Sequence, residues 1–121
     1  MMFKYILHTL AAVQLKDDFI EVLEKNYNSV LPDVVKQIVS LSEDTVHYDD
    51  FSLIRGLSHD EIIDASTDMS VDFISKQLLP LFDLGDNDYI VYNVVEKTWY
   101  KFNIVDEIVF SKADDISEYF L

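Results

Sequence analysis

The sequence predicts an α+β fold in which helices come first and an antiparallel β-sheet meander of about four to six strands follows. Between Asp17 and Lys76, apolar residues recur at the spacing of one helix face. Between Leu78 and Phe110, short runs of β-branched and aromatic residues are separated by turn-forming residues. We therefore expect one domain over residues 1–121, with no linker and no internal repeat, and with the helices packed on one face of the sheet.

Residues 1–16 are expected to form an additional N-terminal helix, because Ile6, Leu10 and Val13 follow the i, i+4, i+7 spacing of a helix face. The apolar run Phe3–Leu15 superficially resembles a secretion signal. Polar residues interrupt this run, and it is too short to span a membrane. The pattern favours an amphipathic helix in a soluble, cytoplasmic protein.

Two helices are expected next. Asp17 and Asp18 place acidic side chains at the positive end of a helix that runs to about Asn26. Pro32 is tolerated in the first turn of a second helix, whose apolar face ends at Leu41. The polar and acidic residues that follow are expected to form a loop.

A third helical segment begins at Ser58. Ser58 and Glu61 have the S-x-x-E spacing of a capping box, in which each side chain bonds a free backbone N–H at the helix start. We expect a helix, or a broken pair of helices, to about Lys76.

The remaining elements are strands, tight turns and a closing helix at Asp114–Leu121. Tyr89–Val95 is apolar on both alternating faces, which is typical of a central strand covered on both sides. The expected strands are Leu78–Leu84, Tyr89–Val95, Thr98–Ile104 and Glu107–Phe110. The expected turns are Gly85–Asn87 and Glu96-Lys97, and the side chains expected to be largely buried are Tyr89, Val91, Tyr92 and Phe102.

The charge of the chain is strongly negative and unevenly distributed. The formal net charge is −14, and twelve of the 23 acidic residues lie between Ser42 and Asp88, where Arg55 and Lys76 are the only basic residues. Such a surface repels nucleic acid and anionic membranes, so the expected partner is a basic protein. The alternative is that the charge keeps an aromatic-rich chain soluble.

Several kinds of chemistry lack the residues that they require. The two glycines, Gly56 and Gly85, cannot build a phosphate-binding or dinucleotide-binding loop, and the absence of cysteine excludes thiol chemistry and disulfides. The three histidines, His8, His47 and His59, show no metal-ligand spacing, and each is expected to be a surface or partly buried imidazole.

The local sequence closest to a Ca²⁺ or Mg²⁺ site contains Asp83, Asp86 and Asp88. Read as an EF-hand loop from Asp83 or from Asp86, its twelfth position is Val94 or Lys97, where a bidentate Glu is required. The match fails in both registers, and the residues favour a turn between strands. We therefore expect no metal and no cofactor.

The arrangement that points most directly to binding is acidic. Asp60, Asp64 and Asp68 are spaced i, i+4, i+8 and form one ridge on the expected helix, although such like charges oppose the helix that carries them. The structural interpretation is a solvent-exposed helix face without a partner. The functional interpretation is a surface that binds lysines and arginines of another protein. The expected partner-binding residues are Glu43, Asp44, Asp49, Asp50, Asp60, Glu61, Asp64, Asp68 and Asp72.

The order of several motifs resembles the SMI1/KNR4 (SUKH) superfamily. The segment Glu21–Pro32 has the form E-x-x-E…Y-x-x-x-LP, and Leu79–Tyr92 is similar to the family's LPIF-x-x-GD-x-DYI-x-Y hairpin. Trp99 on the next strand and the end of the chain, Ile108–Leu121, continue the resemblance, which covers the chain from about Asp17. The shared residues look mainly structural: Leu31, Pro32, Gly85, Tyr89 and Trp99.

The resemblance implies a binding domain and not an enzyme. Many bacterial members look like immunity proteins, which block a toxin by binding it, and fungal relatives act in regulation through protein contacts. The leading hypothesis is thus an immunity protein whose acidic surface meets a basic partner such as a nuclease toxin. The alternatives are a regulatory scaffold without a toxin partner and a carboxylate metal-dependent hydrolase.

Overall fold

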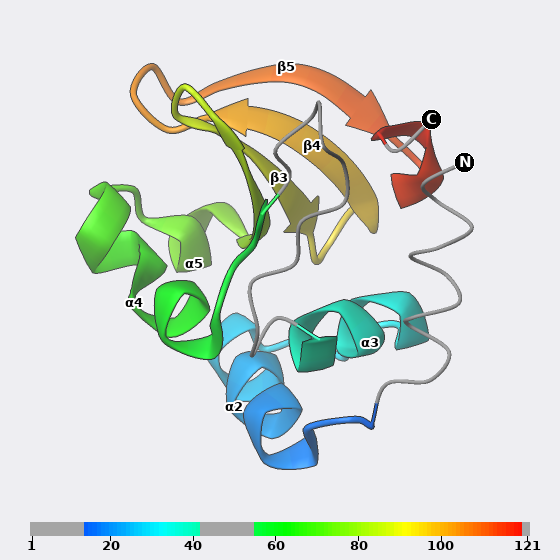
Figure 1. Ribbon diagram of the computed structural model, residues 1–121. Coiled ribbons are helices and arrows are strands. Elements are labelled where there is room, and N and C mark those ends of the chain that lie inside the picture. The colour runs from blue at the N-terminus through cyan, green and yellow to red at the C-terminus, as the bar shows by residue number, and fades with distance from the viewer. Residues whose placement is uncertain (1–13, 42–54, 120–121) are drawn as a thin grey trace.

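The computed structural model describes residues 14–41 and 55–119, with helices preceding an antiparallel meander (Figure 1). The helices are α2 (Asp17–Tyr27), α3 (Asp33–Leu41), α4 (His59–Met69) and α5 (Phe73–Lys76), followed at the end by a 3₁₀ helix, η1 (Ile116–Tyr119). The strands are β1 (Arg55–Gly56), β2 (Leu78–Gly85), β3 (Asp88–Asn93), β4 (Thr98–Asn103) and β5 (Ile108–Ala113). All five form one antiparallel sheet in sequence order, which confirms the predicted α+β class.

The helix boundaries agree with the local sequence signals. Asn28 has a φ of 49° and ends α2 in the left-handed conformation, and the Glu24 carboxylate accepts a 2.7 Å hydrogen bond from the Leu31 N–H in the turn that follows. Helix α3 begins directly after Pro32. The predicted capping box at Ser58 is present, and the predicted broken pair of helices is α4 and α5.

Both faces of the sheet are covered, so the prediction that helices pack on one face only is wrong. On β3, Ile90 and Tyr92 pack in a core cluster with α2 and α3, whereas Val91 between them packs with Phe73 of α5. Adjacent residues of a strand point to opposite faces. Without α4 and α5, Val91 and its apolar neighbours on the second face of the sheet would be exposed to water.

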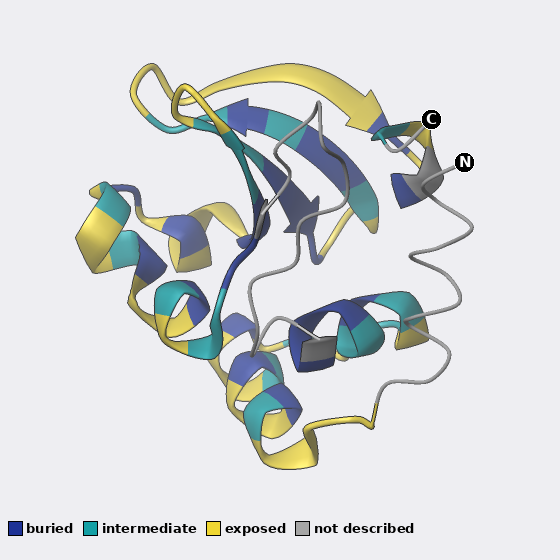
Figure 2. Cartoon of the chain, viewed as in Figure 1, coloured by how far each residue is buried: buried dark blue, intermediate teal, exposed yellow. Residues whose placement is uncertain are grey.

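The core is continuous from the helices into the central strands (Figure 2). Each fully buried large apolar side chain contributes roughly 1.5–3 kcal/mol relative to exposure. Among the residues that the structure describes, the largest of these are Phe73, Phe82, Leu23, Leu31, Leu57, Leu79, Leu81 and Ile90. Val91, Tyr92 and Phe102 are buried as predicted, but Tyr89 is only half-buried because it lies beside the turn that ends the β2–β3 hairpin.

The β2–β3 turn confirms the prediction for Gly85–Asn87. Asp86 and Asn87 have φ values of 54° and 66°, and Gly85 before them has a φ of 88°. Two successive residues with positive φ are typical of a type I′ turn, which matches the twist of the two strands that it joins. Asp, Asn and Gly are the residues that adopt this conformation most readily.

The next two turns share one construction. The Asn93 carboxamide oxygen accepts hydrogen bonds from the N–H groups of Val95 and Glu96, at 3.0 and 2.8 Å. The Asn103 carboxamide oxygen accepts from the equivalent N–H groups two and three residues later, both at 3.0 Å. Each turn ends with a positive φ, 58° at Lys97 and 54° at Glu107.

The connection from β3 to β4 is therefore four residues long and not the two that Glu96-Lys97 predicts, so Val94 and Val95 lie outside β3. Asn-Val-Val-Glu-Lys from position 93 and Asn-Ile-Val-Asp-Glu from position 103 match in residue type almost throughout. The two segments therefore use the same local turn chemistry.

Three further predictions concern the closing helix, the N-terminal helix and the acidic loop. In the described part of the expected closing helix, Asp114 and Asp115 are not helical and Ile116–Tyr119 form the 3₁₀ helix η1, while residues 120–121 lie outside the described part. Residues 14–16 precede α2 without helical structure, and residues 1–13 and 42–54 lie outside the described part, so the N-terminal helix and the acidic loop stay predictions. No helix in the described ranges is long and apolar enough to cross a membrane.

Candidate protein-binding surface

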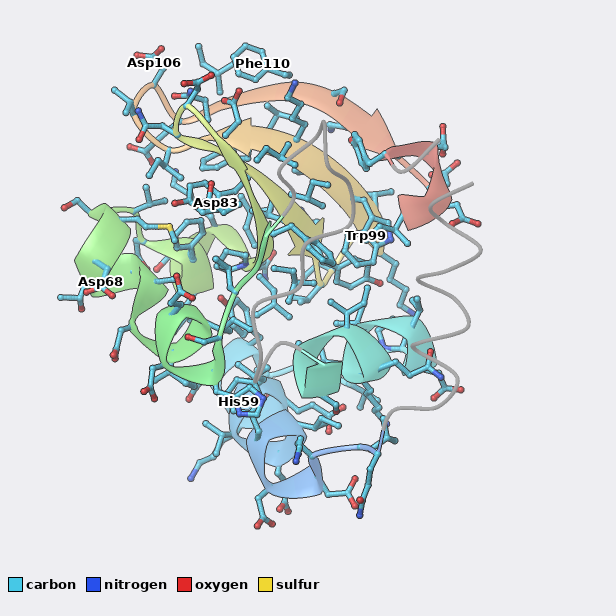
Figure 3. The ribbon with its side chains drawn as sticks, in the orientation of Figure 1. His59, Asp68, Asp83, Trp99, Asp106 and Phe110 are labelled. Carbon is cyan, nitrogen blue, oxygen red and sulfur yellow. The ribbon has the colours of Figure 1, made fainter. Side chains whose placement is uncertain are left out.

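The acidic ridge forms as the spacing predicts. Asp60, Asp64 and Asp68 are all exposed on α4, and their i, i+4, i+8 spacing aligns them along one side of the helix. Figure 3 shows Asp68 on the side of α4 that points away from the sheet. We call these three residues the α4 ridge.

The α4 ridge has no basic partner among the residues that the structure describes. Among the described residues, ion pairs join Lys76 to Glu107 at 3.0 Å and Lys112 to Glu96 at 3.9 Å. Neither pair involves the ridge. The described part of the structure thus shows three exposed carboxylates side by side without an ion pair.

Glu61 and Asp72, also expected at the partner surface, hold helix ends. The Glu61 carboxylate accepts a 3.0 Å bond from the Ser58 N–H, and the Ser58 hydroxyl accepts a 3.2 Å bond from the Glu61 N–H. The Asp72 carboxylate accepts a 3.2 Å bond from the Ser75 N–H at the start of α5. Hydrogen bonds from Ser75 and, more weakly, the charge of Lys76 lower the pKa of Asp72.

An exposed apolar side chain that the sequence pattern did not indicate lies beside the ridge. Ile63 is 43% exposed and projects from the outward half of α4, next to the ridge in angular position. Helical spacing indicates which face is outward, but it does not show that an isoleucine there stays uncovered. The surface can therefore offer apolar contact as well as charge.

The remaining predicted partner residues, Glu43, Asp44, Asp49 and Asp50, fall outside the described residues. The structure neither joins them to the α4 ridge nor separates them from it.

The aspartates of the β2–β3 hairpin form the turn. The Asp83 carboxylate accepts a 2.8 Å bond from the Gly85 N–H, and the Asp88 carboxylate accepts a 2.9 Å bond from the Asn103 side-chain amide. Within residues 14–41 and 55–119, no three His, Asp or Glu side chains are grouped so that they could hold a metal ion. The observed hydrogen bonds give these aspartates a structural role.

His59 joins three helices. Its ring stacks on Phe19 of α2 with centroids 3.9 Å apart, and its Nε2 lies 3.0 Å from the Val39 carbonyl oxygen of α3 (Figure 3). The ring is partly buried at the first residue of α4, as expected for a structural imidazole. His8 and His47 lie outside the described residues.

No protein-family model, curated protein or solved structure matches this chain. The resemblance of its motifs to the SUKH superfamily therefore stays a prediction. Several motif residues have identifiable structural roles: Leu31 and Trp99 are buried in the main core cluster, and Gly85 adopts the positive φ of the turn.

Proposed function

We propose that this protein is a cytoplasmic protein-binding domain of the immunity type, which neutralises a cognate toxin by covering a basic surface. The observation that supports the proposal is the α4 ridge, in which Asp60, Asp64 and Asp68 are exposed together without a basic partner among the described residues. Three aligned like charges oppose their own helix by roughly 0.2–0.5 kcal/mol per neighbouring pair. A basic partner would neutralise these charges and relieve the repulsion.

The chemistry of the partner follows from the sign of the charge. A nuclease cleft is basic because it holds phosphate groups, so an acidic inhibitor can occupy the same surface. With a net charge of −14, the protein also attracts a basic partner over distance, which accelerates the encounter. Ile63 beside the ridge supplies apolar contact once the charges have oriented the two proteins.

Where an adjacent gene encodes a large protein with a basic C-terminal domain, the test measures association with that domain. The variant Asp60→Asn, Asp64→Asn, Asp68→Asn removes the charge of the α4 ridge. Because exposed charges act mainly on association, we expect a lower association rate with little change in dissociation. Raising ionic strength to about 0.15 M, where the Debye length is about 8 Å, should slow the wild type more than the variant. Stopped-flow kinetics at two salt concentrations gives both results.

The matched control is Asp17→Asn, Asp18→Asn, Glu21→Gln, which removes three exposed acidic charges from α2. It removes as many negative charges from the protein as the ridge variant does. If the control slows association equally, overall charge and not the ridge is responsible. A ridge variant that associates as fast as wild type at low salt rejects the ridge as the binding site.

A further inference from the structure

Strand β5 is an exposed sheet edge whose first half is apolar. It pairs with β4 on one side, and no described strand pairs with its other side. Ile108, Val109 and Phe110 are 47%, 37% and 56% exposed, and Figure 2 shows exposure along nearly the whole strand. A free edge of this kind presents unpaired backbone N–H and C=O groups to another extended chain.

Acidic residues flank β5 at both ends. Asp106 and Glu107 come directly before β5, Asp114 and Asp115 come directly after it, and all four are exposed. Glu107 is paired with Lys76 at 3.0 Å. At ~3.3 Å per residue, the two acidic pairs are roughly 20–25 Å apart along the strand. Two lysines lie between the acidic pairs: Lys112 is 3.9 Å from Glu96 and 4.9 Å from the centre of the Tyr100 ring, and Lys101 of β4 is 6.0 Å from the centre of the Phe110 ring.

The acidic residues at both ends of β5 also disfavour pairing of this edge with β5 of a second copy of the chain. If two β5 strands paired antiparallel, Asp106 and Glu107 of each would face Asp114 and Asp115 of the other. If they paired parallel, each acidic pair would face its own equivalent. Both arrangements place like charges directly opposite, which destabilises strand pairing. The net charge of −14 on each chain adds to the repulsion.

A segment with basic residues at its two ends replaces this repulsion by attraction at both ends of β5. We infer that the edge of β5 binds an extended, basic segment of another protein, which adds a strand to the sheet. Its terminal basic residues would contact Asp106 at one end and Asp114 at the other. Apolar side chains between them would cover Ile108 and Phe110. Backbone hydrogen bonds supply affinity in this mode, and the flanking side chains supply specificity.

This inference uses a different surface from the α4 ridge and can hold or fail independently of the proposed function. Residues of β5 and of the ridge lie in separate elements, and no contact between α4 and β5 ranks among the main packing interfaces of the fold. A toxin domain that binds the ridge leaves the edge of β5 untested, so the two need separate probes.

The probe is a capped synthetic peptide with two lysines at each end and alternating valine and threonine between them. Titrated into ¹⁵N-labelled protein, it should shift amide resonances of β5 and slow their hydrogen exchange. Phe110→Ser should weaken binding about tenfold, as loss of a central aromatic contact does. Asp106→Asn with Asp114→Asn should weaken it several-fold at low salt and less at high salt.

Three controls test whether the peptide binds at the edge of β5. The double variant Asp17→Asn, Glu21→Gln removes the same charge from exposed positions of α2 and should leave binding unchanged. A peptide N-methylated at alternate positions keeps its charge but cannot form the backbone ladder, so it should not bind. A peptide with glutamates in place of the lysines should not bind either.

Several results would overturn the inference. If both double variants weaken binding equally, the overall charge of the protein and not the edge of β5 explains the effect. Binding of the N-methylated peptide would exclude strand addition. No binding at about 1 mM peptide, an affinity of only about −4 kcal/mol, would also reject it. Sedimentation that shows a dimer abolished by Phe110→Ser would identify a second copy as the occupant instead.

Discussion

Asn93 and Asn103 each organise a turn, and the surroundings of the two side chains differ. Both accept two backbone N–H bonds, but Asn93 is buried and its amide also donates a 3.2 Å bond to the Tyr100 hydroxyl. That hydroxyl in turn donates to the Glu96 carboxylate. The Asn103 amide donates to Asp88 in a partly exposed position. The same local motif is therefore part of the core in one turn and part of the surface in the other.

We predict that Asn93→Ala destabilises the protein more than Asn103→Ala. Removing Asn93 leaves buried polar groups without a partner, which costs about 1–3 kcal/mol, whereas water can replace Asn103 and limit the loss to about 1 kcal/mol or less. Urea unfolding of both variants measures the difference. Equal losses would mean that the turn bonds, and not the buried link to Tyr100, account for the effect.

The stability of α4 as an element depends on where each charge of the ridge falls. Asp60 lies in the first turn, where the helix dipole favours an acidic side chain. Asp68 lies next to the last residue, where the dipole disfavours it. Repulsion from Asp64 acts on both of them. The two ends of the α4 ridge therefore affect the helix differently.

We predict that Asp68→Asn stabilises the protein by about 0.5 kcal/mol, because it relieves both the dipole and the repulsion. Asp60→Asn should change stability by at most a few tenths of a kcal/mol, since the two effects oppose each other there. Thermal unfolding at low and high salt checks this, and the gain at position 68 should shrink with salt. A gain of equal size at position 60 would contradict the assigned role of the dipole.

On the scale of the whole molecule, Tyr27 connects the first described helix to the sheet. Its hydroxyl donates a 2.9 Å hydrogen bond to the Leu78 carbonyl oxygen, 51 residues along the chain. Burial raises the pKa of Tyr27 above the usual tyrosine value, and the nearby charge of Asp72 raises it further. The neutral phenol is thus favoured in the folded state.

This shift predicts a loss of stability at high pH. Below the unfolded pKa of about 10, Tyr27 is protonated in both states and its contribution is fully present. Above that pH the unfolded state releases the proton first, so the free energy of unfolding falls as pH rises toward the folded pKa. Tyr27→Phe should cost about 1 kcal/mol at pH 8 through the lost hydrogen bond. Tyr27→Phe should also make the free energy of unfolding fall less steeply above about pH 10.

Urea unfolding from pH 8 to about 11 measures both effects. Burial also raises the pKa of Tyr92, so the decline should become shallower in the variant without disappearing. An unchanged slope in Tyr27→Phe would show that other groups carry the alkaline dependence.

Local signals were sufficient to predict most elements. The capping residues at Ser58 and Glu61, Pro32 before α3, and the Gly-Asp-Asn turn at 85–87 each act within a few residues, so the sequence shows them directly. The period of apolar residues placed β2, β3 and β4 for the same reason, but β5 runs three residues past the predicted Glu107–Phe110, and β1 was not predicted. The paired asparagine turns were not predicted either, because their role depends on hydrogen bonds that the structure shows.

Long-range packing decided what these signals could not. The sequence by itself determined that β3 is apolar on both faces. The tertiary structure decided which helices cover each face, because α2 and α3 lie far from β3 in sequence and their contacts with it are not encoded by any local pattern. Likewise, the sequence determined that Asp60, Asp64 and Asp68 align on a helix. The order of strands in the sheet placed β5 at the edge. Phe110 of β5 is exposed and Phe102 of β4 is buried, although both are aromatic residues of predicted strands.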